Sequence, residues 1–215
     1  PIVDLFWDFG DGNSATGTNV SHAYTAAGIY TVILVAVSES GQADAEVKLN
    51  YIVVNPLPDV GFDISENGCI VPFEVLIANT SDAGLNYDWD FGNGQSSTLF
   101  SPDAITYIDT GSYVITLTVS NPITGCSASD SQAIVISNFT ADFSAPLTGC
   151  IGSPIQFTDG STSLANSWAW DFGDGQSSNT SNPTHSYASS GTYSVTLTTQ
   201  DTGLGCSDSI SYDIN

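Results

Sequence analysis

The sequence predicts an all-β protein made of tandem two-sheet sandwiches, and three observations lead to this fold class. A six-residue motif occurs three times, hydrophobic residues alternate with a period of two, and clusters of Gly, Asn, Asp, Ser and Pro interrupt the alternation at short intervals. No segment shows the periodicity of a helix of any length. Alternation with period two is typical of strands that bury one face, so we expect many short strands.

The repeated motif divides the chain into three copies of one module. It reads Trp-Asp-Phe-Gly-Asp-Gly at residues 7–12 and 170–175, and Trp-Asp-Phe-Gly-Asn-Gly at residues 89–94. The tryptophans are 82 and 81 residues apart (89 − 7 and 170 − 89), and a Gly-x-Tyr segment follows each motif at a nearly constant distance. A constant period indicates a repeat architecture. The predicted repeats are residues 1–56, 57–137 and 138–215.

Aromatic residues of these repeated segments form the predicted core. The Trp and the Phe of the motif are two positions apart, which places them on one face of a strand. The tyrosine of Gly-x-Tyr begins a second strand with the same alternation, and the Asp-Gly that ends the motif predicts a tight turn. The predicted core residues are Trp7, Phe9, Trp89, Phe91, Trp170, Phe172, Tyr30, Tyr113 and Tyr193.

The first copy is expected to be incomplete. By comparison with residues 59–86 of the second copy, it lacks the strands that should precede Trp7. A sandwich without these strands exposes an unpaired edge and half of its core. We therefore expect the chain to be cut from a longer array of repeats.

Together, these segments resemble the PKD domain. Beyond the motif, the resemblance includes His-x-Tyr at His22 and His185, followed by Gly-x-Tyr with alternating aliphatic residues. It covers essentially the whole chain and implies an immunoglobulin-like β-sandwich in each copy. The second copy departs from the pattern, with Asn93 for the second Asp and Ile105 for the His. Because isoleucine occupies the histidine position in this copy, we expect the residue at that position to pack in the core and not to take part in chemistry.

The charge of the chain excludes some classes of partner. There are 23 acidic residues and one basic residue, Lys48, giving a formal net charge of −22. Such a surface repels a phosphate backbone and an anionic membrane, so we expect no nucleic acid and no direct membrane insertion. No apolar run approaches the roughly 18 residues needed to span a bilayer.

Four cysteines indicate an oxidising, extracellular compartment. Cys69 and Cys126 are 57 residues apart (126 − 69) in the second copy, and Cys150 and Cys206 are 56 apart (206 − 150) in the third. Each of these repeats has a matched pair, which predicts one disulfide within each repeat. Free buried thiols or a metal site are the alternatives, although no Cys-x-x-Cys or neighbouring His supports a metal.

The acidic motif admits three interpretations: a calcium site, a pair of catalytic carboxylates, or a turn. Its presence in every copy favours a turn, and Asn93 removes one member of any acid–base pair. We therefore predict no catalytic residue and no enzyme. Calcium, which some PKD-like domains bind, is the only cofactor considered, and turn capping on a solvated acidic face is the alternative. The candidate ligands are Asp8, Asp11, Asp171 and Asp174.

One strand of the first copy is apolar on both faces. Ile33, Val35 and Val37 stand where the other copies have threonines, and Ile52 and Val54 continue the pattern. Two-sided apolar strands predict that something covers the outer face. A neighbouring repeat or a partner chain is one explanation, and a core arrangement peculiar to this copy is the other.

The resemblance leads to three hypotheses of function. Large secreted adhesins of gliding, Bacteroidetes-type bacteria are similar, so the leading hypothesis is a non-catalytic stalk or filament segment of a cell-surface adhesin. Its partners would be neighbouring repeats and surface polysaccharide or protein. PKD domains also accompany secreted polysaccharide- and protein-degrading enzymes, which makes an accessory substrate-binding module the alternative. The third hypothesis is an assembling subunit whose first copy takes strands from a neighbour.

Overall fold

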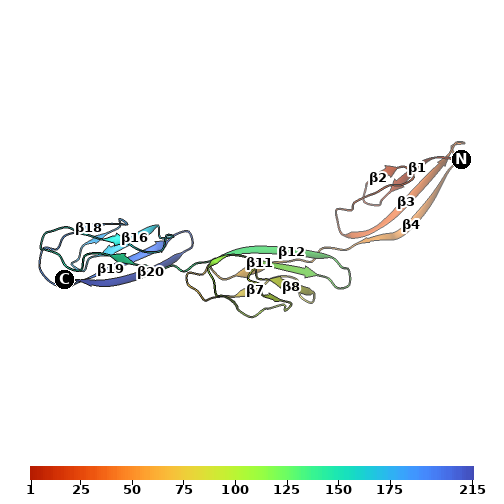
Figure 1. Cartoon of the computed structure of the whole chain (residues 1–215). Coiled ribbons are helices and arrows are strands. Elements are labelled where there is room, and N and C mark those ends of the chain that lie inside the picture. Colours follow the sequence, from red (N-terminus) through yellow and green to blue (C-terminus); the bar gives the residue numbers. More distant parts are fainter. The chain divides into compact units, whose positions relative to one another are not determined.

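The computed structural model describes all residues 1–215, and it contains strands and turns but no helix (Figure 1). The all-β class and the tandem immunoglobulin-like sandwiches expected from the sequence are confirmed. A long apolar helix able to cross a bilayer is absent from the chain.

A four-stranded sheet recurs in all three copies, with the motif tryptophan on one of its two inner strands. In the first copy the order is β2-β1-β3-β4, with β1 (Ile2–Asp8), β2 (Ser14–Thr16), β3 (Gly28–Ser38) and β4 (Ala43–Val54). In the second it is β12-β11-β8-β9, with β8 (Asn86–Asp90), β9 (Ser96–Ser97), β11 (Gly111–Ser120) and β12 (Ser127–Ile136). In the third it is β17-β16-β19-β20, with β16 (Ser167–Asp171), β17 (Ser177–Ser178), β19 (Tyr193–Asp201) and β20 (Cys206–Ile214).

Short paired strands form a second layer in the second and third copies only. In the second copy the pairs are β5 (Phe62–Ile64) with β7 (Ile77–Asn79) and β6 (Phe73–Val75) with β10 (Ile105–Tyr107). In the third they are β13 (Phe143–Ser144) with β15 (Thr158–Asp159) and β14 (Ile155–Gln156) with β18 (Thr184–His185). The first copy has a single sheet, because each of these pairs has at least one strand from the segment that precedes the motif, and only residues 1–6 precede it in the first copy.

Both layers meet in one core in the third copy. The ring of Trp170 lies 5.0 Å from that of Phe143 and 5.6 Å from that of Phe157, between centroids. Aromatic side chains bury the largest apolar areas, so these contacts contribute much of the stability of the copy. The buried residues of this core are Phe143, Ile155, Phe157, Trp170, Phe172, Tyr187, Val195, Leu197 and Ile214.

The apolar outer face of the first copy belongs to β3 and its two neighbours. Val35 lies opposite Phe6 of β1, and Ile33 lies opposite Val47 of β4. Phe6 and Val47 are 45% and 47% exposed. Val37 continues the same face of β3, so these side chains form an apolar strip on the single sheet.

The expectation that Ile52 and Val54 extend this outer strip is wrong. Ile52 lies opposite Tyr30 and Val54 opposite Gly28, on the inner face of the sheet. The register shift between Tyr30 and Val32 inserts two extra residues of β4, so the even-numbered residues of β4 face inward on both sides of it. Alternation along β4 therefore places Val47, which lies opposite Ile33, on the outer face, and Ile52 and Val54 on the inner face.

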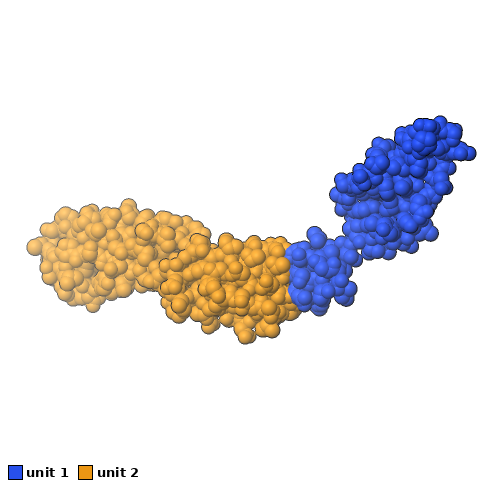
Figure 2. Space-filling model, turned by 45° about the vertical axis from the view of Figure 1, so that its right-hand side comes forward, with its two compact units in different colours: residues 1–59, 82–86, 119–128 blue, residues 60–81, 87–118, 129–215 orange.

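The chain forms two compact units (Figure 2). One comprises residues 1–59, 82–86 and 119–128, and the other comprises residues 60–81, 87–118 and 129–215. The second unit therefore holds the whole third copy and most of the second. Each sheet draws its strands from a single predicted repeat, while the exact repeat boundaries stay a prediction.

Candidate functional site

The motif ends its strand in a tight turn that its own residues stabilise. In the third copy, Trp170 and Phe172 point into the core and are 1% and 2% exposed. Between them, Asp171 accepts a hydrogen bond on Oδ1 from the Gly173 N–H at 2.9 Å. Gly173 has a φ of 77°, and a Cβ there would lie 2.7 Å from the Ser194 carbonyl oxygen. Backbone conformation and this close approach both require glycine.

A histidine contacts the second aspartate of the motif in the first and third copies. His185 Nε2 lies 2.8 Å from Asp174 Oδ2, and its ring stacks on Phe172 with centroids 4.2 Å apart. His22 Nε2 lies 2.7 Å from Asp11 Oδ2 in the first copy. The histidine position is therefore part of the packing, as expected, and it also anchors the turn.

These contacts change the acidity of the aspartates. Partial burial acts to raise the pKa of Asp11, but hydrogen bonds from His22 and from the backbone and side chain of Asn13 outweigh it and lower the pKa to about 2. The pKa of Asp174 is lowered in the same way, with burial opposed by hydrogen bonds from His185 and the Gln176 N–H. Both carboxylates are thus held in their ionised form.

The second copy lacks both members of this pair. Asn93 replaces the aspartate and donates from Nδ2 to the Thr106 carbonyl at 3.4 Å, while Ile105 replaces the histidine and is buried. The two substitutions are therefore linked. With isoleucine in place of the histidine, an aspartate at position 93 would be partly desolvated and would lack a hydrogen-bond donor. The sequence could have predicted the contact between the two positions, because both residues are replaced in the same copy.

Tyrosine hydroxyl and tryptophan indole groups in all three copies donate to the backbone of the same turns. The tyrosine of His-x-Tyr donates to the carbonyl of the motif Phe, and the motif Trp donates from Nε1 to a carbonyl ten residues later. The hydroxyl donors are Tyr24, Tyr107 and Tyr187, at 3.0, 2.7 and 3.0 Å, and the indole donors are Trp7, Trp89 and Trp170, at 3.0, 3.0 and 2.9 Å. Burial raises the pKa of Tyr107 and of Tyr187 to about 12.

The four aspartates considered for calcium already accept hydrogen bonds inside their turns. Asp8 and Asp171 accept from the glycine two residues on, and Asp11 and Asp174 accept from both a backbone N–H and a histidine. No group of three or more His, Cys, Asp or Glu side chains is arranged to hold a metal ion. Calcium binding by these residues stays a prediction.

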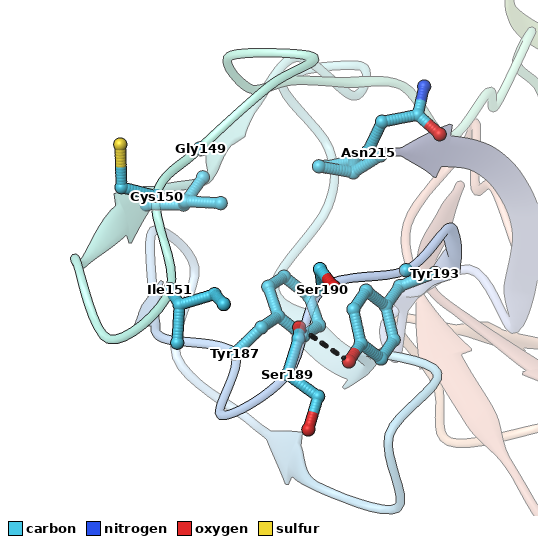
Figure 3. A pocket seen from close by; sticks show the side chains of 11 residues that line it. Gly149, Cys150, Ile151, Tyr187, Ser189, Ser190, Tyr193 and Asn215 are labelled. Carbon is cyan, nitrogen blue, oxygen red and sulfur yellow. Dashed lines mark hydrogen bonds between the residues drawn. The ribbon is translucent and has the colours of Figure 1, made fainter.

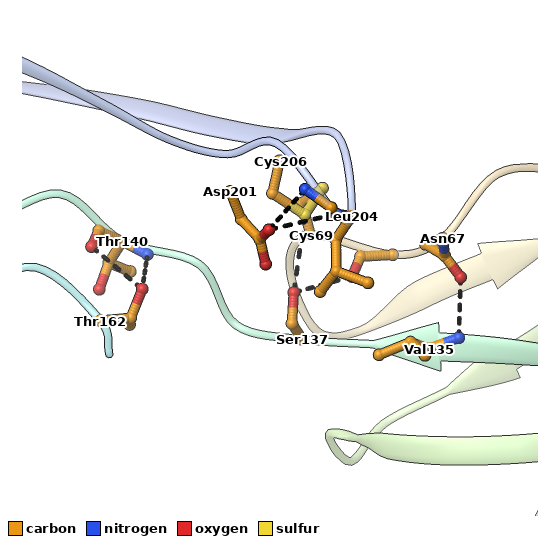
Figure 4. The surroundings of a disulfide bond; sticks show 11 residues. Asn67, Cys69, Val135, Ser137, Thr140, Thr162, Asp201, Leu204 and Cys206 are labelled. Atoms are coloured by element: carbon orange, nitrogen blue, oxygen red, sulfur yellow. Dashed lines mark hydrogen bonds between the residues drawn. A yellow bond between two sulfur atoms is a disulfide. The ribbon is translucent and has the colours of Figure 1, made fainter. Parts of the chain in front are cut away.

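One disulfide joins the second copy to the third (Figure 4). It links Cys69, in the loop between β5 and β6, to Cys206, the first residue of β20, with Cα atoms 5.4 Å apart and a sequence separation of 137. Cys126 and Cys150 are free thiols. The predicted pairs within each repeat, Cys69 with Cys126 and Cys150 with Cys206, are therefore wrong.

The two cysteines of one copy lie at opposite ends of its sandwich. The Cys69 carbonyl accepts from the Phe139 N–H just beyond the end of β12, whereas Cys126 directly precedes the start of β12. A strand of 10 residues is about 33 Å long, but a disulfide requires Cα atoms within about 7 Å. The same separation by β20 keeps Cys150 from Cys206.

The chain around this disulfide is buried and hydrogen-bonded. Ser137 donates from its N–H and its Oγ to the Gly68 carbonyl, at 2.8 and 3.1 Å, and its Oγ lies 3.7 Å from Cys206 Sγ. Phe139 is buried beside it, and the Ala141 N–H donates to Asp208 Oδ2 at 2.8 Å. The segment between the two copies is thus fixed on both sides and is not a free linker.

The free thiol of Cys150 lies at the end of the third copy, in the loop that corresponds to that of Cys69. Figure 3 shows it at the rim of a small cavity beside Tyr187 and Tyr193, with its sulfur pointing away from both rings. The cavity holds about 80 Å³. Small-molecule sites usually measure about 300 Å³ or more, so this cavity does not suit such a ligand.

Known protein families include the repeat described above. A family model described as "PKD domain" matches residues 1–54 and 140–214, and a second one with the same description matches residues 63–133. The chain belongs to the PKD domain family. Its three copies are therefore PKD repeats, and the tandem arrangement expected from the sequence is confirmed.

Relatives of these PKD repeats occur in much longer proteins. Polycystin-1 of Homo sapiens is 29% identical over 217 residues, which is 91% of this chain and 5% of polycystin-1. Collagenase ColA of Bacillus cereus is 43% identical over 60 residues, 26% of this chain and 6% of the collagenase. The crystal structure of the PKD1 domain from the Vibrio cholerae metalloprotease PrtV is 36% identical and covers 39% of this chain and 100% of that chain, with a TM-score of 0.33. The chain spans only about a twentieth of the curated relatives it matches.

Proposed function

We propose that this chain is a non-catalytic stalk segment of an extracellular cell-surface adhesin, in which PKD repeats hold a binding site away from the cell. The observation that supports it is the disulfide between Cys69 and Cys206, because it joins one repeat to the next. A disulfide within one repeat would stabilise that repeat alone. A disulfide between repeats also resists force that pulls the repeats apart.

The position of this disulfide determines which residues carry tension. When the chain is pulled from its ends, force passes from Cys69 through the sulfur atoms to Cys206, so residues 70–205 are bypassed. At about 3.3 Å per residue, a sequence separation of 137 corresponds to about 450 Å of chain that cannot extend while the bond is intact. A stalk under shear requires this property.

The chemistry of the chain fits the same role. A stable disulfide requires an oxidising compartment, which is found outside the cell. The buried polar groups of the motif are satisfied within their own turns, and the motif carboxylates are held by backbone or histidine donors. Residues engaged in this way support a structural role, because a carboxylate that acts as a general acid or base must be able to exchange a proton with a substrate.

Force spectroscopy on the whole chain tests this proposal. The chain is stretched between its ends, first oxidised and then after reduction of the disulfide. We expect the fully extended length to increase by about 450 Å on reduction. The Cys126→Ser variant is the matched control and should behave like the original chain, since Cys126 is a free thiol. Equal lengths before and after reduction would contradict the proposal.

An accessory substrate-binding module of a secreted polysaccharide- or protein-degrading enzyme is the second candidate function. It is favoured by the similarity to segments of a collagenase and of a metalloprotease. Co-sedimentation of the chain with insoluble collagen, chitin and cellulose separates the two proposals. A stalk segment should remain in the supernatant, whereas an accessory module should sediment with one of these polymers and be released by a soluble fragment of it.

A further inference from the structure

The loops that hold Cys69 and Cys150 differ by one residue in length between the cysteine and the next strand, but they share the position of the cysteine and its attachment to the last strand of the repeat. Each cysteine stands 20 residues before the motif tryptophan (89 − 69 and 170 − 150), and each follows a glycine. The Gly68 N–H donates to the Val135 carbonyl at 3.0 Å, and the Gly149 N–H donates to the Asn215 carbonyl at 3.2 Å. In both copies, the loop is thus tied to the last strand of its own repeat.

Close packing fixes both glycines in this loop. A Cβ on Gly68 would lie 2.6 Å from the ring of Phe73, and a Cβ on Gly149 would lie 2.8 Å from Ile155. The first residue of the following strand therefore presses against the loop in each copy. This contact presents the next residue, the cysteine, at the end of the sandwich.

The turns that hold Cys126 and Cys206 also match. The Gly125 N–H donates to the Asn121 carbonyl and the Gly205 N–H to the Asp201 carbonyl, both at 2.9 Å. The two glycines have φ values of 74° and 76°. Asn121 Oδ1 accepts hydrogen bonds from the N–H groups of Ile123 and Thr124. Asp201 Oδ1 accepts them from the N–H groups of Gly203 and Leu204. Each turn is therefore preformed by its own residues.

We infer that Cys150 is a docking point for the turn cysteine of another PKD repeat, and that Cys126 is the complementary docking point for a loop cysteine. One loop and one turn of this construction are already joined, by Cys69 and Cys206. Cys150 and Cys126 lie in the corresponding loop and the corresponding turn with free thiols. The disulfide between repeats would then recur at each junction along the chain. This inference applies equally to an adhesin stalk and to a module of a secreted enzyme.

The link forms by thiol–disulfide exchange. Two cysteine thiols lose two electrons and two protons when their sulfur atoms bond, and a small-molecule disulfide such as oxidised glutathione takes these up to become two thiols. Successive links overlap along the chain, because Cys126 and Cys150 both lie between Cys69 and Cys206 in sequence. In such an array, the short segment between residues 126 and 150 connects the link that ends at Cys126 to the link that begins at Cys150, alongside the Cys69–Cys206 link.

A chain extended by one repeat tests this inference. A second copy of residues 136–215 is added after Asn215, so that Ile136 and Ser137 form the junction as they do between the second and third copies. The added copy has Cys150→Ser so that only one Cys150 exists. The added copy also has Ser207→Thr as a mass tag at an exposed position. After folding with oxidised glutathione, free thiols are alkylated and chymotryptic peptides are identified without reduction.

We expect the Cys150 peptide to be linked to the tagged Cys206 peptide of the added copy, and the Cys69 peptide to the untagged one. With Cys206→Ser in the added copy, Cys150 should become alkylated. An alkylated Cys150 in the extended chain, or a link from Cys150 to the untagged Cys206, would overturn the inference. The link from Cys69 to Cys206 in the same digest reports that the chain has folded.

The 215-residue chain supplies an independent measurement. Under native conditions, we expect alkylation of Cys150 and protection of Cys69 and Cys206 until a reductant is added. Oxidised chain in which Cys150 is already paired with a cysteine of its own repeat would refute the inference without any extension of the chain.

Discussion

The first and third repeats contain the same motif in different surroundings. Their turns are nearly identical, since His22 lies 2.7 Å from Asp11 and His185 lies 2.8 Å from Asp174. Their tryptophans differ, because Trp170 is fully buried whereas Trp7 is only half-buried on its single sheet. The motif therefore builds its turn from local contacts, and the second layer of strands is what converts the motif into a core.

Truncation of the two tryptophans should produce the largest difference between these repeats. Trp170→Ala removes a side chain that contacts Phe143 and Phe157, and we expect a loss of about 4 kcal/mol in the stability of the third repeat. Trp7→Ala should cost the first repeat less than half as much, because Trp7 has no second layer against it. Hydrogen exchange measured repeat by repeat in increasing urea would show this difference, and equal losses would contradict it.

Removal of one tyrosine hydroxyl should have a smaller effect of the same kind. Tyr187→Phe leaves the carbonyl of Phe172 without its donor inside the core, at an expected cost of about 1–2 kcal/mol. Tyr24→Phe in the first repeat should cost less, since water can reach the corresponding carbonyl of Phe9 at a half-buried site. Urea unfolding of both variants provides the comparison. A larger cost for Tyr24→Phe would mean that the first repeat has a dry core.

Acid should distinguish the repeats that have the His–Asp pair from the one that lacks it. The pKa of Asp11 is about 2 in the folded chain, below the value of about 3.9 for an unfolded aspartate. Its ionisation therefore adds stability above pH 4, and this is lost as the pH falls from about 4 to about 2. The lowered pKa of Asp174 has the same sign.

Asp11→Asn is the variant that isolates this effect. It should destabilise the first repeat at pH 6 and have much less effect near pH 2, where the stabilising effect of the carboxylate charge is mostly lost. The second repeat serves as an internal control, because Asn93 stands at that position. Unfolding by urea across this pH range measures the dependence, and an equal effect at pH 2 and pH 6 would show that the carboxylate charge contributes nothing.

Calcium should have the smallest effect. The carboxylates of Asp11 and Asp174 already accept hydrogen bonds from a backbone N–H and a histidine, so a cation would have to displace these donors. We expect the same unfolding temperature in a chelator and in millimolar calcium. A rise with calcium that disappears in Asp11→Asn and in the corresponding Asp174→Asn would establish these turns as calcium sites.

Much of each repeat could be predicted because its determinants are close in sequence. The turn of Asp171 and Gly173, and the alternation along β11 and β19, depend on contacts within a strand or a hairpin. The face of β4 could not be predicted in the same way. It depends on how β4 pairs with β3: Val47 lies opposite Ile33, whereas Ile52 lies opposite Tyr30 on the inner face.

The sequence by itself determined the three repeats, the all-β class and the tight motif turns, because period, alternation and turn chemistry are local properties of the chain. Only the tertiary structure decided the partners of the cysteines. A spacing of 57 residues fits a bond within a repeat as well as a bond to the next repeat. β12, which is about 33 Å long, separates Cys126 from Cys69 at the other end of the sandwich, where Cys206 of the neighbouring repeat is within reach.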